Sequence, residues 1–281
     1  LHCIHHHLQG VVFMAALYQL AWEDTFGGTA LDRAKWNVRI GNWSISEDGT
    51  PLAPGWGNNE QQYYRDDAQN LFVGNDRLTI RALRQTSPVQ FGQRVPYTSA
   101  KIDTRGLFSF CYGKVEFRAR CPLGTGLWPA VWMMPEDHVY GLGTQREIDI
   151  LEAMGRCPDL VCGTIHYGGP PQNKTEQSHS YRLPIGTTIH DFHTYALLWE
   201  PMRLQWYVDG ICYSSISTWG SCPGVEPKLS FPQPFDQKFY LIINLAVGGW
   251  FDPEANGIVD NTAFPADFEI DYIRVYQQHK A

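Results

Sequence analysis

The stretch FYLIINLAV (Phe239–Val247) is apolar at every position except Asn244, and it predicts a strand that is covered on both faces. Other stretches alternate between apolar and polar residues, as strands with one covered face do. No stretch carries an apolar stripe at helical spacing over three turns. The sequence therefore predicts an all-β fold of two packed antiparallel sheets. The alternating stretches are LTIRALR at 78–84, KVEFRAR at 114–120, LQWYV at 204–208 and DYIRVY at 271–276.

Composition indicates one domain and excludes two classes of partner. The net charge is −7, with 22 Lys and Arg against 29 Asp and Glu, and no basic cluster is present, so a nucleic-acid partner is not expected. No apolar run approaches the ~18 residues of a membrane helix. Without linkers, repeats or composition shifts, we expect a monomer with a single domain over residues 18–278. Residues 1–17, which include three consecutive histidines, are interpreted as a leader or cloning remnant, and 279–281 as a tail.

Aromatic residues are frequent, at 14% of the chain, with 10 Trp and 14 Tyr. Flat aromatic faces can cover the apolar faces of sugar rings. The alternative is that most of them fill the core.

The chain has seven cysteines, of which Cys3 lies in the predicted leader. Two bridges are candidates, Cys157–Cys162 across a hairpin turn and Cys212–Cys222. Cys111 and Cys121 lie at the ends of one predicted strand, ~33 Å apart, and cannot bridge. The alternative is that all of the cysteines are free thiols.

The segment REIDILEAMG at 146–155 places Glu147, Asp149 and Glu152 among apolar residues. Residues two apart on a strand share a face, but Glu152 is an odd number of steps from Glu147. A single-residue β-bulge would return Glu152 to the common face and leave Ile148 and Ile150 facing the core. Close carboxyl groups suit a retaining glycosidase, with one attacking and one protonating. The alternatives are a solvated acidic strand or a calcium site.

The motif EIDILE at 147–152 resembles the signature of glycoside hydrolase family 16, in its β-bulge branch with laminarinase-like members. The resemblance implies a β-jelly-roll of two curved antiparallel sheets, with a substrate groove on the concave face. Further matching stretches are YQLAWEDTF at 18–26, WGNNEQQYY at 56–64, the run from KIDTRG to AVWMMP at 101–135, GTIHYGG at 163–169, YVDG at 207–210, FYLIINLAVGGW at 239–250 and DYIRVYQ at 271–277.

The resemblance assigns roles that spacing alone leaves open. It implies that Glu147 is the nucleophile, Glu152 the general acid/base, and Asp149 a helper that hydrogen-bonds the nucleophile. No cofactor is required for this chemistry. The substrate would be a β-glucan polysaccharide or oligosaccharide, cut within the chain at β-1,3 linkages. A secreted or extracytoplasmic location is expected.

A second group of residues is predicted to bind substrate. Pairing of 147–155 with 161–168 would set Glu152 opposite Thr164 and Ile150 opposite His166, with His166 on the acid side near the nucleophile. The resemblance and the Gly-rich loop at 55–59 add aromatic and polar candidates. The predicted substrate-binding residues are Trp56, Asn58, Arg105, Trp128, Trp132, His166 and Trp250.

The resemblance also implies a structural calcium remote from the chemistry. Asp271 would bind it, with backbone carbonyls near Glu23 and Gly74.

Three alternatives to a laminarin hydrolase stay open. These are a mixed-linkage β-1,3/1,4-glucanase or galactan hydrolase, an enzyme that transfers sugars to sugar acceptors, and a non-catalytic β-glucan-binding protein. Such binders typically lose the catalytic acids, whereas this chain has all three.

Overall fold

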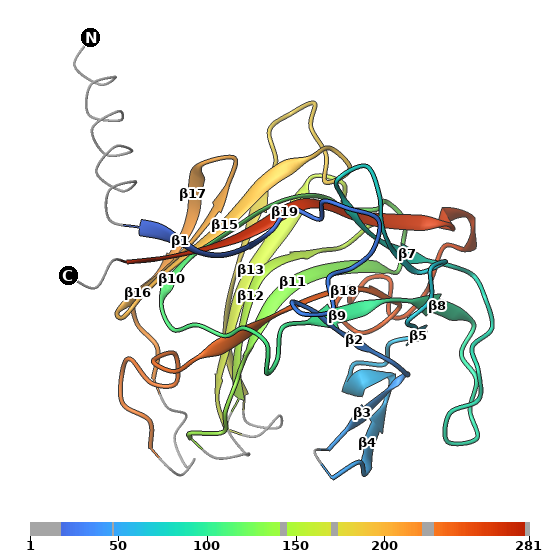
Figure 1. The fold of residues 1–281 in the computed structure, drawn as a ribbon, viewed down its shortest axis with the longest axis horizontal. Helices are drawn as coiled ribbons and strands as arrows, with labels where there is room; N and C mark the ends of the chain where they lie inside the picture. Colours follow the sequence, from blue (N-terminus) through green and yellow to red (C-terminus); the bar gives the residue numbers. More distant parts are fainter. Residues whose placement is uncertain (1–17, 47, 141–144, 170–173, 221–227, 279–281) are drawn as a thin grey trace.

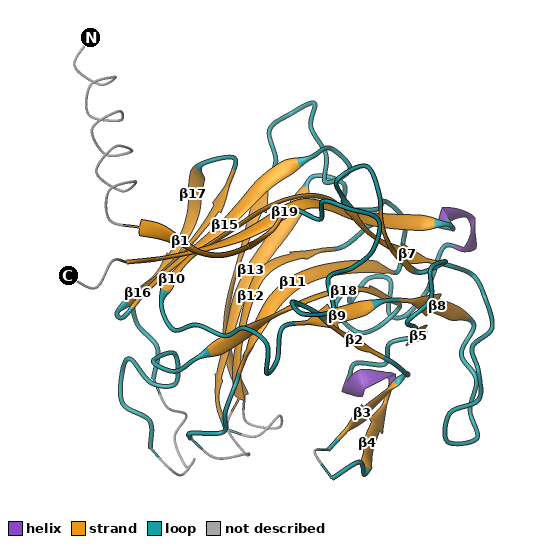
Figure 2. Cartoon of the chain, in the orientation of Figure 1, coloured by secondary structure: helices purple, strands orange, loops and turns teal. Residues whose placement is uncertain are grey.

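The computed structural model describes residues 18–46, 48–140, 145–169, 174–220 and 228–278. Within these ranges the chain forms strands, with two single-turn 3-10 helices, η1 (Gly55–Gly57) and η3 (Asn261–Ala263) (Figure 2). None of the described helices is long and apolar enough to cross a membrane.

The first large sheet has eight strands in the order β17-β16-β15-β10-β19-β7-β6, and β1 also pairs with β19 (Figure 1). Every pair in it is antiparallel. The strands are β1 (Tyr18–Asp24), β6 (Leu71–Val73), β7 (Leu78–Ala82), β10 (Gly113–Arg120), β15 (His193–Glu200), β16 (Arg203–Val208), β17 (Ile211–Ile216) and β19 (Ala266–Gln278).

The second large sheet has seven antiparallel strands in the order β14-β13-β12-β11-β18-β9-β2. The strands are β2 (Asn37–Arg39), β9 (Lys101–Asp103), β11 (Leu127–Pro135), β12 (Gln145–Ala153), β13 (Leu160–Gly168), β14 (Lys174–Arg182) and β18 (Phe239–Val247). Two small pairs flank the sheets, the hairpin of β3 (Trp43–Ile45) with β4 (Pro51–Pro54) and the parallel pair of β5 (Gln62–Tyr64) with β8 (Tyr97–Ser99).

The core lies between the two large sheets. In β10, every second residue is buried, which places Val115, Phe117 and Ala119 in the core. Strand β18 is buried at every position except Tyr240, as its apolar sequence predicted. These observations confirm the all-β jelly-roll sandwich.

The described strands run from Tyr18 to Gln278, whereas the predicted leader with Cys3 and the tail at 279–281 lie outside the described residues. The predicted Cys157–Cys162 bridge is wrong, because both thiols are free. Cys162 is inside β13, where its Sγ lies 3.2 Å from Ser180 Oγ, while Cys157 lies in the preceding turn. Cys212 is also a free thiol, so the predicted Cys212–Cys222 bridge is wrong as well, although Cys222 itself lies outside the described residues.

Candidate active site

The three acids of β12 share one face because the strand carries a bulge. Asp149 pairs with Trp132 of β11, but the next β11 residue in the ladder, Val131, pairs with Leu151. Ile150 is therefore the extra residue, and the ladder to β13 shifts at the same place. Ile148 and Ile150 are buried in the core, 0% and 3% exposed. The predicted bulge is confirmed.

A tryptophan from the opposite sheet fixes the bulge. The Trp206 Nε1–H, from β16, donates to the backbone oxygen of Asp149 at 2.8 Å. Its indole fits because the facing residue is Gly163, where a Cβ would lie 2.3 Å from the Trp206 ring. This support was not predicted, because nothing in the local sequence of β12 indicates a partner 57 residues away.

The hairpin between β12 and β13 differs in register from the prediction. Glu147 lies opposite His166, Asp149 opposite Thr164 and Glu152 opposite Cys162, so the predicted pairs were wrong by two residues at Glu152 and by three at His166. The cause is Gly155, which leaves the ladder and exchanges backbone hydrogen bonds with Gly124 and Leu127. The face was predicted correctly, because His166 is on the acid side.

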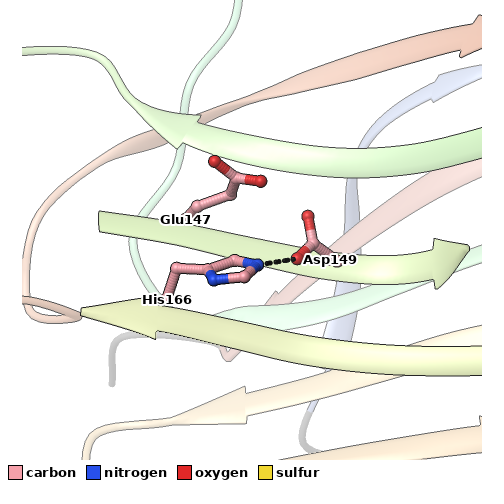
Figure 3. Close-up of side chains that lie close together, drawn as sticks. All are labelled: Glu147, Asp149 and His166. Carbon is pink, nitrogen blue, oxygen red and sulfur yellow. Dashed lines mark ion pairs between the residues drawn. The ribbon is translucent and has the colours of Figure 1, made fainter. Parts of the chain in front are cut away.

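His166 connects the acids to the neighbouring strand. Its Nε2 lies 3.1 Å from Asp149 Oδ2 (Figure 3). Its Nδ1 lies 3.3 Å from Glu176 Oε2 on β14. One ligand atom each from Glu147, Asp149 and His166 lie within 4.8 Å of one another. We call the surface of the sheet that carries Glu147, Asp149 and Glu152 the acid face.

Burial favours the protonated form of both glutamates. It raises the pKa of Glu147 to about 8, with a further increase from the charge of Asp149, whereas His166 and Lys101 lower it. Burial also raises the pKa of Glu152 well above its usual range, with further increases from Asp149 and Glu147. His166 and the indole of Trp128 oppose that shift. The positive charge of Lys101 favours the ionised form of Glu147, which suits a nucleophile beside an acid.

Two predicted tryptophans lie on β11 close to the acids. The Trp128 Nε1–H donates to Glu152 Oε1 at 3.0 Å, and its ring stacks on Phe251 at 4.9 Å. Trp132 is paired with Asp149, and its Nε1–H donates to Asn244 Oδ1 at 2.6 Å. Both side chains are half-buried, so neither is an ordinary core residue.

Lys101 of β9 is a residue of the acid face that the sequence did not reveal. It is only 9% exposed, and its Nζ lies 4.2 Å from the ring centre of Trp56 and 4.8 Å from that of Trp132. Burial lowers its pKa, while the carboxylates of Glu60, Asp103 and Glu147 raise it. A buried cation among tryptophans supplies positive charge to an acidic site.

The loop around Asn58 is braced from within. Asn58 Nδ2 donates to Glu60 Oε1 at 3.2 Å, and its backbone oxygen accepts from Trp250 N at 3.1 Å. Trp250 is 63% exposed, which leaves its ring available to a ligand. The structure therefore places Asn58 beside Trp250. The ring of Trp56, on the same loop, lies against Lys101.

Arg105 lies farther from the acids than its predicted neighbours. It follows β9, which is separated from β12 by β18 and β11, and its guanidinium lies 5.9 Å from the ring centre of Tyr240. Three strand spacings correspond to ~14 Å.

Two of the three predicted calcium ligands, Asp271 and the Glu23 backbone oxygen, are engaged with cationic side chains. The Asp271 carboxylate accepts from Arg77 Nε at 2.8 Å and also pairs with Arg118. The Glu23 backbone oxygen accepts from Lys35 Nζ at 2.9 Å. At Gly74, the backbone N–H donates to the oxygen of Arg77. Calcium requires oxygen ligands without such positive neighbours, so this arrangement does not fit the ion, which stays a prediction.

A family model described as "Glycosyl hydrolases family 16" matches residues 55–272. The chain belongs to glycosyl hydrolase family 16. Glucan endo-1,3-beta-glucosidase A1 of Niallia circulans is 40% identical over 92% of this family 16 chain, which spans only 38% of that protein. The glucan endo-1,3-beta-glucosidase of Cryptopygus antarcticus is 38% identical, with 93% of each chain covered. The catalytic domain of an endo-1,3-beta-glucanase (laminarinase) from Thermotoga petrophila RKU-1 superposes with a TM-score of 0.77 at 36% identity, covering 94% of this chain and 99% of that one.

Proposed function

We propose that this family 16 protein hydrolyses β-1,3-glucans of the laminarin type. It cuts at internal linkages of the polysaccharide and retains the anomeric configuration. The observation that carries the proposal is the bulged strand, which places Glu147, Asp149 and Glu152 on one face. The relatives described above, which are named endo-1,3-β-glucanases, support the choice of substrate.

In the first step, the Glu147 carboxylate attacks the anomeric carbon while Glu152 gives its proton to the departing glycosidic oxygen. The glycosidic bond breaks, and an ester bond between the sugar and Glu147 forms. Asp149 hydrogen-bonds Glu147 and contacts His166, so it orients the nucleophile.

In the second step, the Glu152 carboxylate takes a proton from water, whose oxygen attacks the anomeric carbon and releases Glu147. Glu152 is then protonated again and ready for the next cycle. Burial and the charges of Asp149 and Glu147 favour the protonated form of Glu152, which keeps its proton available in the first step.

Two substitutions separate the roles of the glutamates. Glu147→Ser should abolish laminarin hydrolysis yet regain turnover with an α-glycosyl fluoride, because the nucleophile is missing. Glu152→Ala should spare substrates with very good leaving groups and respond to azide. Near-normal laminarin hydrolysis by either variant would show that the assignment is wrong.

The stereochemical outcome is a separate test. Proton NMR of the first product should show the β-anomer before mutarotation, and initial α-product would exclude a double displacement.

Sugar release from laminarin, barley glucan and agarose distinguishes the β-1,3 specificity from mixed-linkage and galactan hydrolysis. Product analysis at high oligosaccharide concentration detects transfer to sugars, and glucan binding without hydrolysis would indicate a binding protein.

A further inference from the structure

A cavity of about 770 Å³ opens beyond the acid face, at the side of the sheet formed by β2 and β9. It lies where β2, the turn after β9 and the segment after β11 meet. The polar residues that matter for its chemistry are Arg33, Asn37, Arg39, Arg105, Glu136 and Asp137.

Glu136 carries an unused acceptor in the wall of this cavity. Its Oε1 accepts from the backbone N–H of Gly106 at 2.8 Å. Its Oε2 is buried and has no hydrogen-bond partner among the described residues. Leaving a buried carboxylate oxygen unpaired costs free energy, so a ligand with a hydroxyl donor would be stabilised there.

The charges of the lining favour a neutral ligand over an anion. Arg33 pairs with Asp66 at 2.6 Å, and Arg39 pairs with Asp103, so these guanidinium groups are already neutralised. Glu136 and Asp137 add negative charge to the same wall. Sugar hydroxyls both donate and accept, and a wall of carboxylates and guanidinium groups offers partners of both kinds.

A chain of contacts connects the cavity to the acids along the acid face. Asp149 pairs with Trp132, and the Trp132 ring contacts Lys101 Nζ. Lys101 in turn pairs with Arg39, which lines the cavity. The path crosses from β12 through β11, β18 and β9 to β2. Four strand spacings of ~4.8 Å give about 19 Å, a length that takes several sugar rings.

We propose that this cavity is a distal subsite, which binds a glucosyl unit of the same glucan chain that is cut at Glu147. Glu136 Oε2 accepts a sugar hydroxyl there, and Arg105 lies at its margin. The inference rests on the proposed function, and it predicts that long oligosaccharides gain affinity that short ones do not.

The test variant is Glu136→Gln, which keeps an oxygen for the Gly106 N–H and removes the charged acceptor. In a Glu147→Ser background, calorimetry should show laminariheptaose binding weakened roughly three- to tenfold and laminaritriose binding unchanged. With Glu147 present, kcat/KM should fall by the same factor for laminariheptaose only. The matched control is Asp159→Asn, which removes an exposed carboxylate that pairs with Arg182 away from the cavity.

A second variant tests the cavity by volume. A Cβ at Gly106 would meet nothing within 4 Å, and Asn tolerates the φ of +74° at this position, so Gly106→Asn adds bulk without a clash. It should also weaken laminariheptaose selectively. If both variants bind and cleave the two oligosaccharides as their parents do, or affect both equally, the distal subsite is refuted. An unaltered chain that neither binds nor cleaves laminarin would instead refute the proposed function itself.

Discussion

Trp128→Phe separates the hydrogen bond to the catalytic acid from the packing around it. The indole Nε1–H donates to Glu152 Oε1 at 3.0 Å, and the ring stacks on Phe251 with an interplanar angle of 10°. Phenylalanine keeps an aromatic ring against Phe251 but has no N–H. The change therefore removes one donor from Glu152 and leaves its charged neighbours in place.

The sign and size of the effect follow from that bond. A hydrogen bond to a charged group contributes roughly 1 kcal/mol more than one to a neutral group, which corresponds to about 0.7 pKa unit. The indole stabilises the Glu152 carboxylate, so its loss should raise the pKa of Glu152 further. In the proposed mechanism Glu152 acts as an acid in the first step, so activity should fall as pH rises through its pKa. The alkaline limb of the pH–rate profile should therefore move up by about 0.7 unit.

The assay is the pH dependence of kcat/KM on laminarin, with thermal melting to confirm folding. Trp132→Phe is the matched control, because its Nε1–H donates to Asn244 rather than to a catalytic acid. We expect no movement of the alkaline limb in that control. An alkaline limb in Trp128→Phe that stays in place or moves down, in a protein that melts normally, would refute the reasoning.

Three further predictions concern the surrounding groups. Lys101→Met removes a positive charge that lowers the pKa of Glu147, so the acid limb of the profile should move to higher pH, and an acid limb that stays fixed would contradict the electrostatic role. Trp56→Ala removes an aromatic surface, and KM for laminarin should rise roughly ten- to hundredfold from the loss of ~1–3 kcal/mol, with kcat unchanged. Reduced melting with normal kinetics per folded molecule would instead make Trp56 a structural residue. Because Asp271 already pairs with Arg77, excess chelator should leave the melting temperature unchanged, and a decrease that Asp271→Ala abolishes would establish the predicted calcium site.

Local patterns were sufficient for the strands and for the acid face. The apolar stretch Phe239–Val247 forms β18 with the same limits. A strand covered on both faces can be identified from its continuous apolar sequence alone, without knowledge of the strands beside it. The bulge was also predictable, since only an extra residue places both Ile148 and Ile150 in the core while Glu152 joins the other acids. In each case the deciding information lies within a few residues along the chain.

The register of the acid hairpin was not predictable from its own residues. Gly155 ends β12 two residues early because it fits closely against the segment 124–127, where a Cβ would meet the Gly124 oxygen at 2.4 Å. A tertiary contact thus decides which residue faces His166.

The proposed division of roles between the two glutamates also depends on tertiary contacts. Glu147 and Glu152 are the same residue type on one strand, and burial shifts their pKa values in the same direction. What distinguishes them comes from other strands, namely Lys101 of β9 near Glu147 and Trp128 of β11 beside Glu152. A lysine in the short stretch Lys101–Asp103 looks like any polar strand residue, because its burial depends on the rings of Trp56 and Trp132. The motif therefore supplies two carboxyl groups, and the packing of β9 against them places the positive charge of Lys101 where it favours the ionised form of Glu147.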